Sequence, residues 1–479
     1  MNPQECRRTG HVSDDSLARP PLSTGRKAAW ASAGVSENLL GSGFTSLALP
    51  VYNIILGVNP ALISMGMAIP RLLDAFIDPF IGNVSDNART RWGRRRPFIL
   101  VGGILSSVLF ALMWMPPRMS GEGMLFAYFI VMAFSFYLAY SVFVIPYNAM
   151  GYELSYDYHE RTGIGAWKSF FNAIAGLGVQ WLYWLSLQPL WGGDSRTGVM
   201  WVGIAVGLVA LLAILPAVFY SRSQCETPRQ PRIRMLGALR SAWTNRPFRI
   251  LLATSLLVII GFGCVGPFAL YILIYHVSGG DQAEGAKWAG VFGTAFSLAT
   301  FPMLPVITRV SRRFGKKATL IGASVISAGA SLASLVLFSR EHPWLVVASG
   351  LLVAPAGSCI WILLSSMTAD CCDEDELTSG ARQEGLYGAI YAFVTKLCAS
   401  GVTVLTGLLL VISGFHAEET PDESVVMRLR LMYAIVPAVL LFGAAITAAF
   451  YPISEARLRD IRAHLDERRR ANSGLSDSP

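Results

Sequence analysis

The sequence predicts an all-α membrane protein with twelve transmembrane helices. Of its 479 residues, 53% are hydrophobic and 15% are charged, whereas soluble domains carry about a quarter charged residues. A spanning helix needs about 20 mostly apolar residues, and runs of that size recur from one end of the chain to the other. The expected spans are 29–56, 60–83, 97–115, 124–150, 164–190, 197–220, 247–277, 285–308, 317–338, 344–368, 383–413 and 428–452.

The positive charges predict the orientation of these spans. Thirty lysines and arginines, helix-end residues included, lie in the two tails and in the loops that share their side, and six lie in the opposite loops. Cytoplasmic loops carry the excess of basic residues, so we expect a multi-pass protein of the plasma (inner) membrane with both termini in the cytoplasm. The formal net charge of +8 is spread in short clusters between apolar runs, which argues against nucleic-acid binding.

The chain divides into two six-helix halves. Residues 221–246 form a long basic connection between bundles at 29–220 and 247–452. The loop "SDNARTRWGRRRP" after the second span is echoed by "TRVSRRFGKK" after the eighth, which indicates an internal duplication, although topogenesis alone would also account for each basic loop. Residues 1–28 lack the apolar core of a signal peptide, so we expect a disordered tail. The tail 453–479 can begin as an amphipathic helix on the membrane surface or as a solvated charged helix.

Charged residues inside the second span predict a cation site. Asp74 and Asp78 are four residues apart and therefore share one helical face, with Arg71 near it. Charges at membrane depth are costly unless they meet a cavity or a partner. Two carboxylates suit Na⁺, or H⁺ if one of them stays protonated. The alternative is a structural ion pair between Arg71 and one aspartate.

Three further residues could contribute to this site. Glu37 and Asn38 in the first span could complete an oxygen-lined cation pocket, although Glu37 could instead be solvated near a helix end. Lys396 lies far from either end of the eleventh span, and a buried lysine needs a counter-charge. The aspartates of the second span are the obvious partners, so we expect Lys396 near Asp74 and Asp78. A side chain that snorkels to the interface is the alternative.

The loop after the tenth span predicts a gate on the cytoplasmic side. The segment "MTADCCDEDELTSGARQEGLYG" combines an acidic run with one arginine, and such groups can form salt bridges between two halves. The arginines of "RTRWGRRRP" are the expected partners in an outward-open state. The expected gate residues are therefore Asp86, Arg94, Arg95, Arg96, Asp370, Asp373, Arg382 and Glu384.

Three motifs in order resemble the glycoside–pentoside–hexuronide:cation symporter family of the major facilitator superfamily. The stretch "RLLDAFIDPFIG" matches the family's R-x-x-D-A-x-x-D-P-x-x-G motif, "IPYNAMGYELSYDYHERT" its I-P and E-R-T phrases, and "MTADCCDEDELTSGARQEG" its acidic loop. The resemblance implies a major facilitator fold of two six-helix halves and cation-coupled symport by alternating access. It also implies that Asp74 and Asp78 hold the cation, with Asp74 at the meeting point of cation and solute, and that Lys396 lies close to both.

Two features of the sequence bear on the solute. The family's residue before the I-P phrase is acidic or an amide, where this chain has Val144. The eleventh span, "FVTKLCASGVT", also resembles the sodium-dependent lysophosphatidylcholine symporters, and an apolar Val144 would suit an amphiphile. We expect a carbohydrate or glycoside, with a lysophospholipid or another small solute as alternatives. Solute binding and coupling are assigned to Lys396, Arg71, Trp361, Val144 and Lys168.

Other classes of protein fit the sequence less well. The chain has no paired histidines at metal spacing, no G-x-S-x-G and no Gly-rich phosphate loop. We therefore expect no enzyme activity and no cofactor other than the coupling ion. A passive channel would not require an acidic pair in one half matched to a lysine in the other. The expected partners are the solute and membrane lipids, and we expect a monomer.

Overall fold

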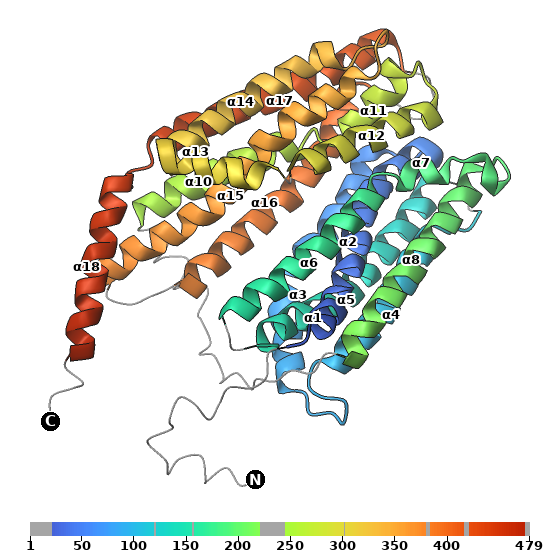
Figure 1. The fold of residues 1–479 in the computed structure, drawn as a ribbon. Helices are drawn as coiled ribbons and strands as arrows, with labels where there is room; N and C mark the ends of the chain where they lie inside the picture. The colour runs from blue at the N-terminus through green and yellow to red at the C-terminus, as the bar shows by residue number, and fades with distance from the viewer. Residues whose placement is uncertain are drawn as a thin grey trace.

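The fold was analysed in a computed structural model, which describes residues 22–118, 121–155, 158–220, 245–300, 302–379, 384–415 and 421–474. Every regular element within these ranges is a helix, as expected (Figure 1). The helices form two bundles, which we call the N-half (22–220) and the C-half (245–474).

The N-half contains the helical segments of the first six expected spans. Asn59 caps the second of them by accepting a hydrogen bond from the Ala61 amide, and Pro60 occupies the first helical position, where its missing N–H costs nothing. The elements are α1 (Thr24–Ala31), α2 (Ala33–Leu49), η2 (Pro50–Ile55), α3 (Pro60–Asn87), α4 (Arg96–Met113), α5 (Glu122–Glu153), α6 (Tyr158–Val179), α7 (Leu182–Ser186), η3 (Pro189–Trp191) and α8 (Ser195–Tyr220).

The C-half is also built from helices in its described residues, and its last element, α18, follows the last expected span. Asn245 caps its first helix by accepting from the Phe248 amide. The elements are α10 (Arg246–Gly263), α11 (Phe268–Ile272), η4 (Leu273–Val277), α12 (Gln282–Thr300), α13 (Met303–Phe314), α14 (Lys316–Leu337), α15 (Leu345–Ser379), α16 (Glu384–Ile412), α17 (Glu423–Ala449) and α18 (Glu455–Gly474).

The helices follow the expected spans closely. In the described part of the chain, eight helices are long and apolar enough to cross a membrane, or ten if each of two bent pairs counts as one span. The expected spans 29–56 and 164–190 complete the twelve as helical segments built from α1, α2 and η2 and from α6 and α7. Helix α1 begins at Thr24, inside the segment expected to be a tail. Residues 1–21, and the connection 221–244, lie outside the described residues.

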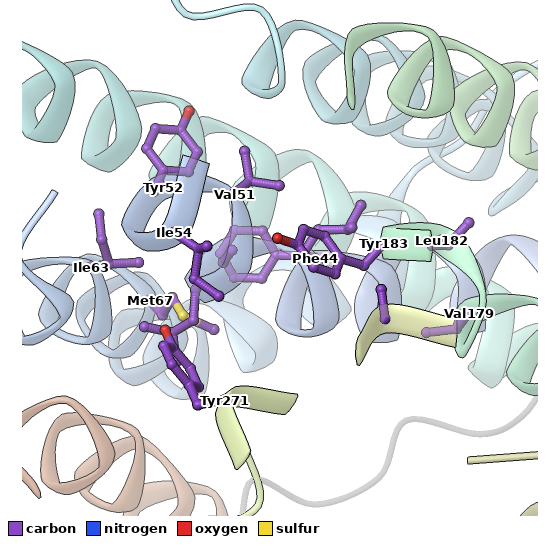
Figure 2. Packing of buried hydrophobic residues seen from close by; sticks show 14 of the residues in the cluster. Phe44, Val51, Tyr52, Ile54, Ile63, Met67, Val179, Leu182, Tyr183 and Tyr271 are labelled. Atoms are coloured by element: carbon purple, nitrogen blue, oxygen red, sulfur yellow. The ribbon is translucent and has the colours of Figure 1, made fainter. Parts of the chain in front are cut away.

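Among the described residues, the two halves share a buried core at one face of the molecule only. The start of α1 and the whole of α18 lie at the same end of the bundles (Figure 1). We call this end the terminal face and the opposite end the far face. At the far face a single cluster of buried residues joins Phe44 and Tyr52 of the N-half to Phe268 and Tyr271 of the C-half. Figure 2 shows Tyr271 beside Met67 in this cluster.

A buried hydrogen bond crosses the halves within this far-face core. The Tyr271 hydroxyl donates to Asn53 Oδ1 at 2.9 Å, and both residues are fully buried. Toward the terminal face the buried residues form two separate clusters, one in each half. The structure is therefore closed at the far face, with the cores of the two halves separate at the terminal face.

Helices α3 and α16 carry the contact between the halves toward the middle of the membrane. A Cβ atom at Gly407 would lie 2.5 Å from Ser64 Oγ and 2.6 Å from the Pro60 carbonyl oxygen. Nearer the middle, the rings of Phe76 and Phe393 meet edge to face with centroids 6.1 Å apart. At the far-face ends of the two helices, Gly407 allows the close approach because it has no side chain.

The C-terminal tail docks onto the C-half as an amphipathic helix. Leu458, Ile461 and Leu465 of α18 are buried in the core cluster of this half, against residues of α15. Just before α18, the Tyr451 carbonyl accepts a hydrogen bond from Lys317 at the start of α14. From the sequence, this helix could lie on the membrane surface or in solvent. In the structure it packs against α15.

Candidate functional site

Three charged side chains meet where α3 contacts α16. Lys396 Nζ lies 2.5 Å from Asp74 Oδ2 and 2.7 Å from Asp78 Oδ2. Ser141 of α5 donates a hydrogen bond to the other oxygen of Asp74. The lysine belongs to the C-half and both carboxylates to the N-half, so the expected contact between Lys396 and the aspartates is present. The cluster carries two negative charges and one positive charge when all three are ionised.

The cluster offers unused oxygen atoms. Asp78 Oδ1 is buried and accepts no hydrogen bond from the described residues. Asp74 contributes a second carboxylate and Ser141 a hydroxyl, which are the oxygen ligands that hard cations prefer. Arg71 lies against the Tyr137 hydroxyl of α5, and it is Lys396, not Arg71, that bridges the two aspartates.

A second charged cluster joins α2, α5 and α6 within the N-half. Lys168 Nζ lies 2.7 Å from Glu37 Oε2 and donates to Asn148 Oδ1, while Asn148 Nδ2 donates to Glu37 Oε1 at 3.0 Å. The Lys168 ammonium also lies 5.2 Å from the centre of the Tyr147 ring. The sequence predicts Glu37 as a cation ligand beside the aspartates, and the structure places it against Lys168 instead. Asn148 was missed, although its place two residues after Pro146 in the I-P-Y-N phrase was a usable signal.

Buried polar atoms without partners surround this second cluster. Asn38 Oδ1, Asn172 Oδ1 and the Tyr147 hydroxyl accept or donate no hydrogen bond among the described residues. Helix α2 approaches α6 closely here, because a Cβ atom at Gly34 would lie only 3.0 Å from Asn172 Oδ1. Buried polar groups are nearly always hydrogen-bonded, so this set points to a ligand rich in hydroxyl groups or to water.

A third feature is a cavity of about 410 Å³ inside the C-half, between α10, α12, α14, α15 and α17. Aromatic side chains and hydroxyl groups line it, and its described lining contains no charged residue. Trp361 forms part of the wall and is 45% exposed. Val144 lies in the other half, packed against the N-half core cluster. The structure therefore does not bring Trp361 and Val144 together.

Ion pairs hold each half together at the terminal face. Glu153 at the end of α5 is 2% exposed and pairs with Arg94 at 2.5 Å and with Arg95 at 2.9 Å; Arg95 also pairs with Asp86 at 2.6 Å. In the C-half, Asp370 of α15 pairs with Lys316 at 2.6 Å. These pairs lie within one half, whereas the expected gate pairs cross between halves.

The remaining expected gate residues lie partly outside what the structure describes. Arg96 donates to the Phe219 carbonyl at the end of α8. Asp373 lies on α15, three residues beyond Asp370. Arg382 lies outside the described residues, and so does the side chain of Glu384. The role of all these residues as a gate stays a prediction.

The family follows from comparison with known proteins. The model of the family described as "MFS/sugar transport protein" matches residues 29–455, which is most of the chain. The chain belongs to this family. It is an integral membrane transporter of the major facilitator fold, not an enzyme, and it carries a small-molecule solute.

The relatives are named as transporters and align along nearly their whole length. The chain is 26% identical to the "Uncharacterized symporter YnaJ" of Bacillus subtilis (strain 168), covering 93% of this chain and 96% of the relative. It is 26% identical to the "Glucuronide carrier protein homolog" of Escherichia coli (strain K12), covering 89% and 92%. It is 24% identical to "Sodium-dependent lysophosphatidylcholine symporter 1" of Mus musculus, covering 99% and 94%.

Solved structures share the fold. The crystal structure of a bacterial homologue of the human lysosomal transporter Spinster, in an inward-facing and unoccupied conformation, superposes with a TM-score of 0.63. The superposition covers 90% of this chain and 98% of the other, at 14% identity. At that identity the likeness shows the fold alone.

Proposed function

We propose that this protein is a cation-coupled symporter that moves a carbohydrate or glycoside across the membrane by alternating access. The observation that carries the proposal is the bridge from Lys396 of the C-half to Asp74 and Asp78 of the N-half. A charge cluster that joins the two moving bodies in the middle of the membrane is where ion binding can change their relative position.

The proposed coupling is a competition for the two carboxylates. A cation bound at Asp74 and Asp78 would compete with the Lys396 ammonium for the same oxygen atoms, because Lys396 Nζ already contacts Asp74 Oδ2 and Asp78 Oδ2. Release of Lys396 weakens the contact between α3 and α16 and lets the halves rearrange. When the cation leaves, Lys396 returns to both carboxylates and offsets one of their two negative charges. Binding that differs between two states is what shifts their populations.

Na⁺ and H⁺ both fit this scheme. Na⁺ would take the Asp74 and Asp78 oxygens, including the unpartnered Asp78 Oδ1, with the Ser141 hydroxyl nearby. H⁺ would bind one carboxylate and abolish one of the two negative charges that hold Lys396. Glu37 and Asn38 stay candidate cation ligands, but the contact of Glu37 with Lys168 favours a role in solute binding.

The N-half cluster of Glu37, Asn148 and Lys168 is the proposed solute site. Charged and amide groups in fixed positions suit a ligand with many hydroxyl groups, because each hydroxyl can both donate and accept. The unpartnered oxygens of Asn38 and Asn172 would accept hydrogen bonds from such a solute. The relative named as a glucuronide carrier homologue supports a sugar.

A lysophospholipid is the second candidate solute. The C-half cavity of about 410 Å³, lined by Trp361 and other aromatic side chains without a charged group, suits an acyl chain. The polar N-half cluster would then hold the head group, and Val144 would lie beside an amphiphile. The relative named as a sodium-dependent lysophosphatidylcholine symporter supports this reading.

We also propose that the terminal face is cytoplasmic and that the protein lies in the plasma membrane. Basic residues concentrate at this face, as the positive-inside rule requires. The far-face closure then makes the described conformation the inward-facing one. The arginines near Glu153 and the acidic end of α15 would pair across the halves when the terminal face closes.

The test is uptake by purified protein in proteoliposomes. A panel of labelled glycosides and a labelled lysophosphatidylcholine are offered with and without an inward Na⁺ gradient or pH gradient. Accumulation that follows the cation gradient, lost in Asp78→Asn and kept in the exposed far-face control Asp194→Asn, is the expected result. Accumulation by Asp78→Asn equal to that of the unmodified protein would remove Asp78 from the cation site.

A further inference from the structure

A groove of about 370 Å³ lies on the outside of the C-half, where the start of α10 meets the end of α17. Its lining residues are Arg246, Arg249, Ile250 and Ala253 of α10 and Thr447 and Phe450 at the end of α17. It is separate from the charge clusters and from the cavity that holds Trp361. Nothing in the transport scheme uses it.

The groove is divided into a charged rim and an apolar floor. Arg246 and Arg249 are exposed, one helical turn apart at the start of α10, and neither forms an ion pair with a described residue. The described lining contains no carboxylate. Ala253 lies seven residues after Arg246 on α10. At 1.5 Å per residue, this places it about 10 Å deeper into the membrane than Arg246. Phe450, 66% exposed, forms the opposite wall.

We propose that this groove binds an anionic phospholipid of the leaflet at the terminal face. The phosphate would contact the two guanidinium groups, because arginine binds phosphate oxygens in a fork geometry that lysine cannot match. One acyl chain would lie along Ile250 and Ala253, against Phe450. Basic pockets between transmembrane helices on this side of a membrane hold acidic lipid head groups in general. A soluble phosphate compound would use the rim and leave the apolar floor empty.

The experiment is native mass spectrometry of the full-length protein with dioleoylphosphatidylglycerol and, separately, dioleoylphosphatidylcholine. We compare Arg246→Gln/Arg249→Gln with Arg309→Gln/Arg312→Gln, which removes the same two charges from exposed positions of α13 in the same half. Two arginines near an anionic lipid together change binding by about thirtyfold. We expect the groove variant to bind phosphatidylglycerol about thirtyfold more weakly than the unmodified protein. The α13 control should bind it about as well as the unmodified protein.

A second variant separates a lipid from free phosphate. Ala253→Phe fills the floor and keeps both arginines, so it should also lose phosphatidylglycerol, and excess inorganic phosphate should not displace the lipid from the unmodified protein. Equal retention in the two double variants would overturn the site. Full lipid binding by Ala253→Phe, or displacement by phosphate alone, would overturn the assignment to a membrane lipid.

Discussion

The hydrogen bond between Tyr271 and Asn53 makes a quantitative prediction about the equilibrium between conformations. Tyr271→Phe removes the hydroxyl that donates to Asn53 Oδ1 at 2.9 Å in a fully buried place. Losing one partner of a buried hydrogen bond costs about 1–3 kcal/mol. When the far face opens, water can replace the bond, so that state loses almost nothing. The population ratio should therefore shift toward the far-face-open state by about 5- to 150-fold.

Tyr52→Phe is the matched control for this change. Tyr52 is the same residue type, is fully buried in the same far-face cluster, and donates to the Met113 carbonyl at 2.6 Å. Its bond lies wholly within the N-half. The control should therefore lose a similar amount of thermal stability and leave the balance between conformations unchanged.

The assay is pulsed electron resonance between spin labels on the two halves at the far face. Exposed positions suited to labelling are Leu190 in the N-half and Glu341 in the C-half, and an unnatural ketone side chain leaves the seven native cysteines intact. Tyr271→Phe should add a population at longer distance, and Tyr52→Phe should not. Identical distance distributions for the two variants would refute the view that this bond closes the far face.

Two further predictions concern packing and charge. Gly407→Ala should open the far face, because its Cβ would press within 2.5 Å of Ser64 Oγ, whereas Gly401→Ala on the same helix meets nothing within 4 Å; equal spin-label distances in the two variants would contradict this. Glu153→Ala should destabilise the protein by about 3–5 kcal/mol, because it leaves the buried Arg95 with fewer partners. Glu153→Gln keeps an acceptor and should lose less, so equal melting temperatures for the two would count against the ion-pair argument.

Much of the central charge cluster could be predicted from the sequence. Asp74 and Asp78 had to share a helical face because of their spacing, and Lys396 in an apolar segment needed a counter-charge. Few other carboxylates lie within the expected spans, so the need of Lys396 for a counter-charge paired residues 318 and more positions apart. The side chains of Asp74, Asp78 and Lys396 are 13%, 34% and 29% exposed, which fits a site that lies between the two halves.

The second cluster could not be predicted in the same way. Glu37, Asn148 and Lys168 each sit on a different helix, and periodicity tells which face of a helix is polar without telling which helix that face meets. The sequence left Glu37 open between the cation pocket and a solvated helix end, and the close approach of α2 to α6 at Gly34 brings it to Lys168 instead. The partners of the terminal-face arginines could not be predicted for a related reason, since they depend on the conformation. In the described conformation these arginines pair within their own half.

The sequence by itself determined the twelve helical segments and the need of Lys396 for an acidic partner, because burial in a membrane constrains every apolar run and every charge locally. The tertiary structure alone decided which face of the molecule is closed, how Tyr271 reaches Asn53, and that α18 packs on α15. These depend on how rigid helices pack against one another, and contacts between surfaces far apart in the chain carry no periodic signal.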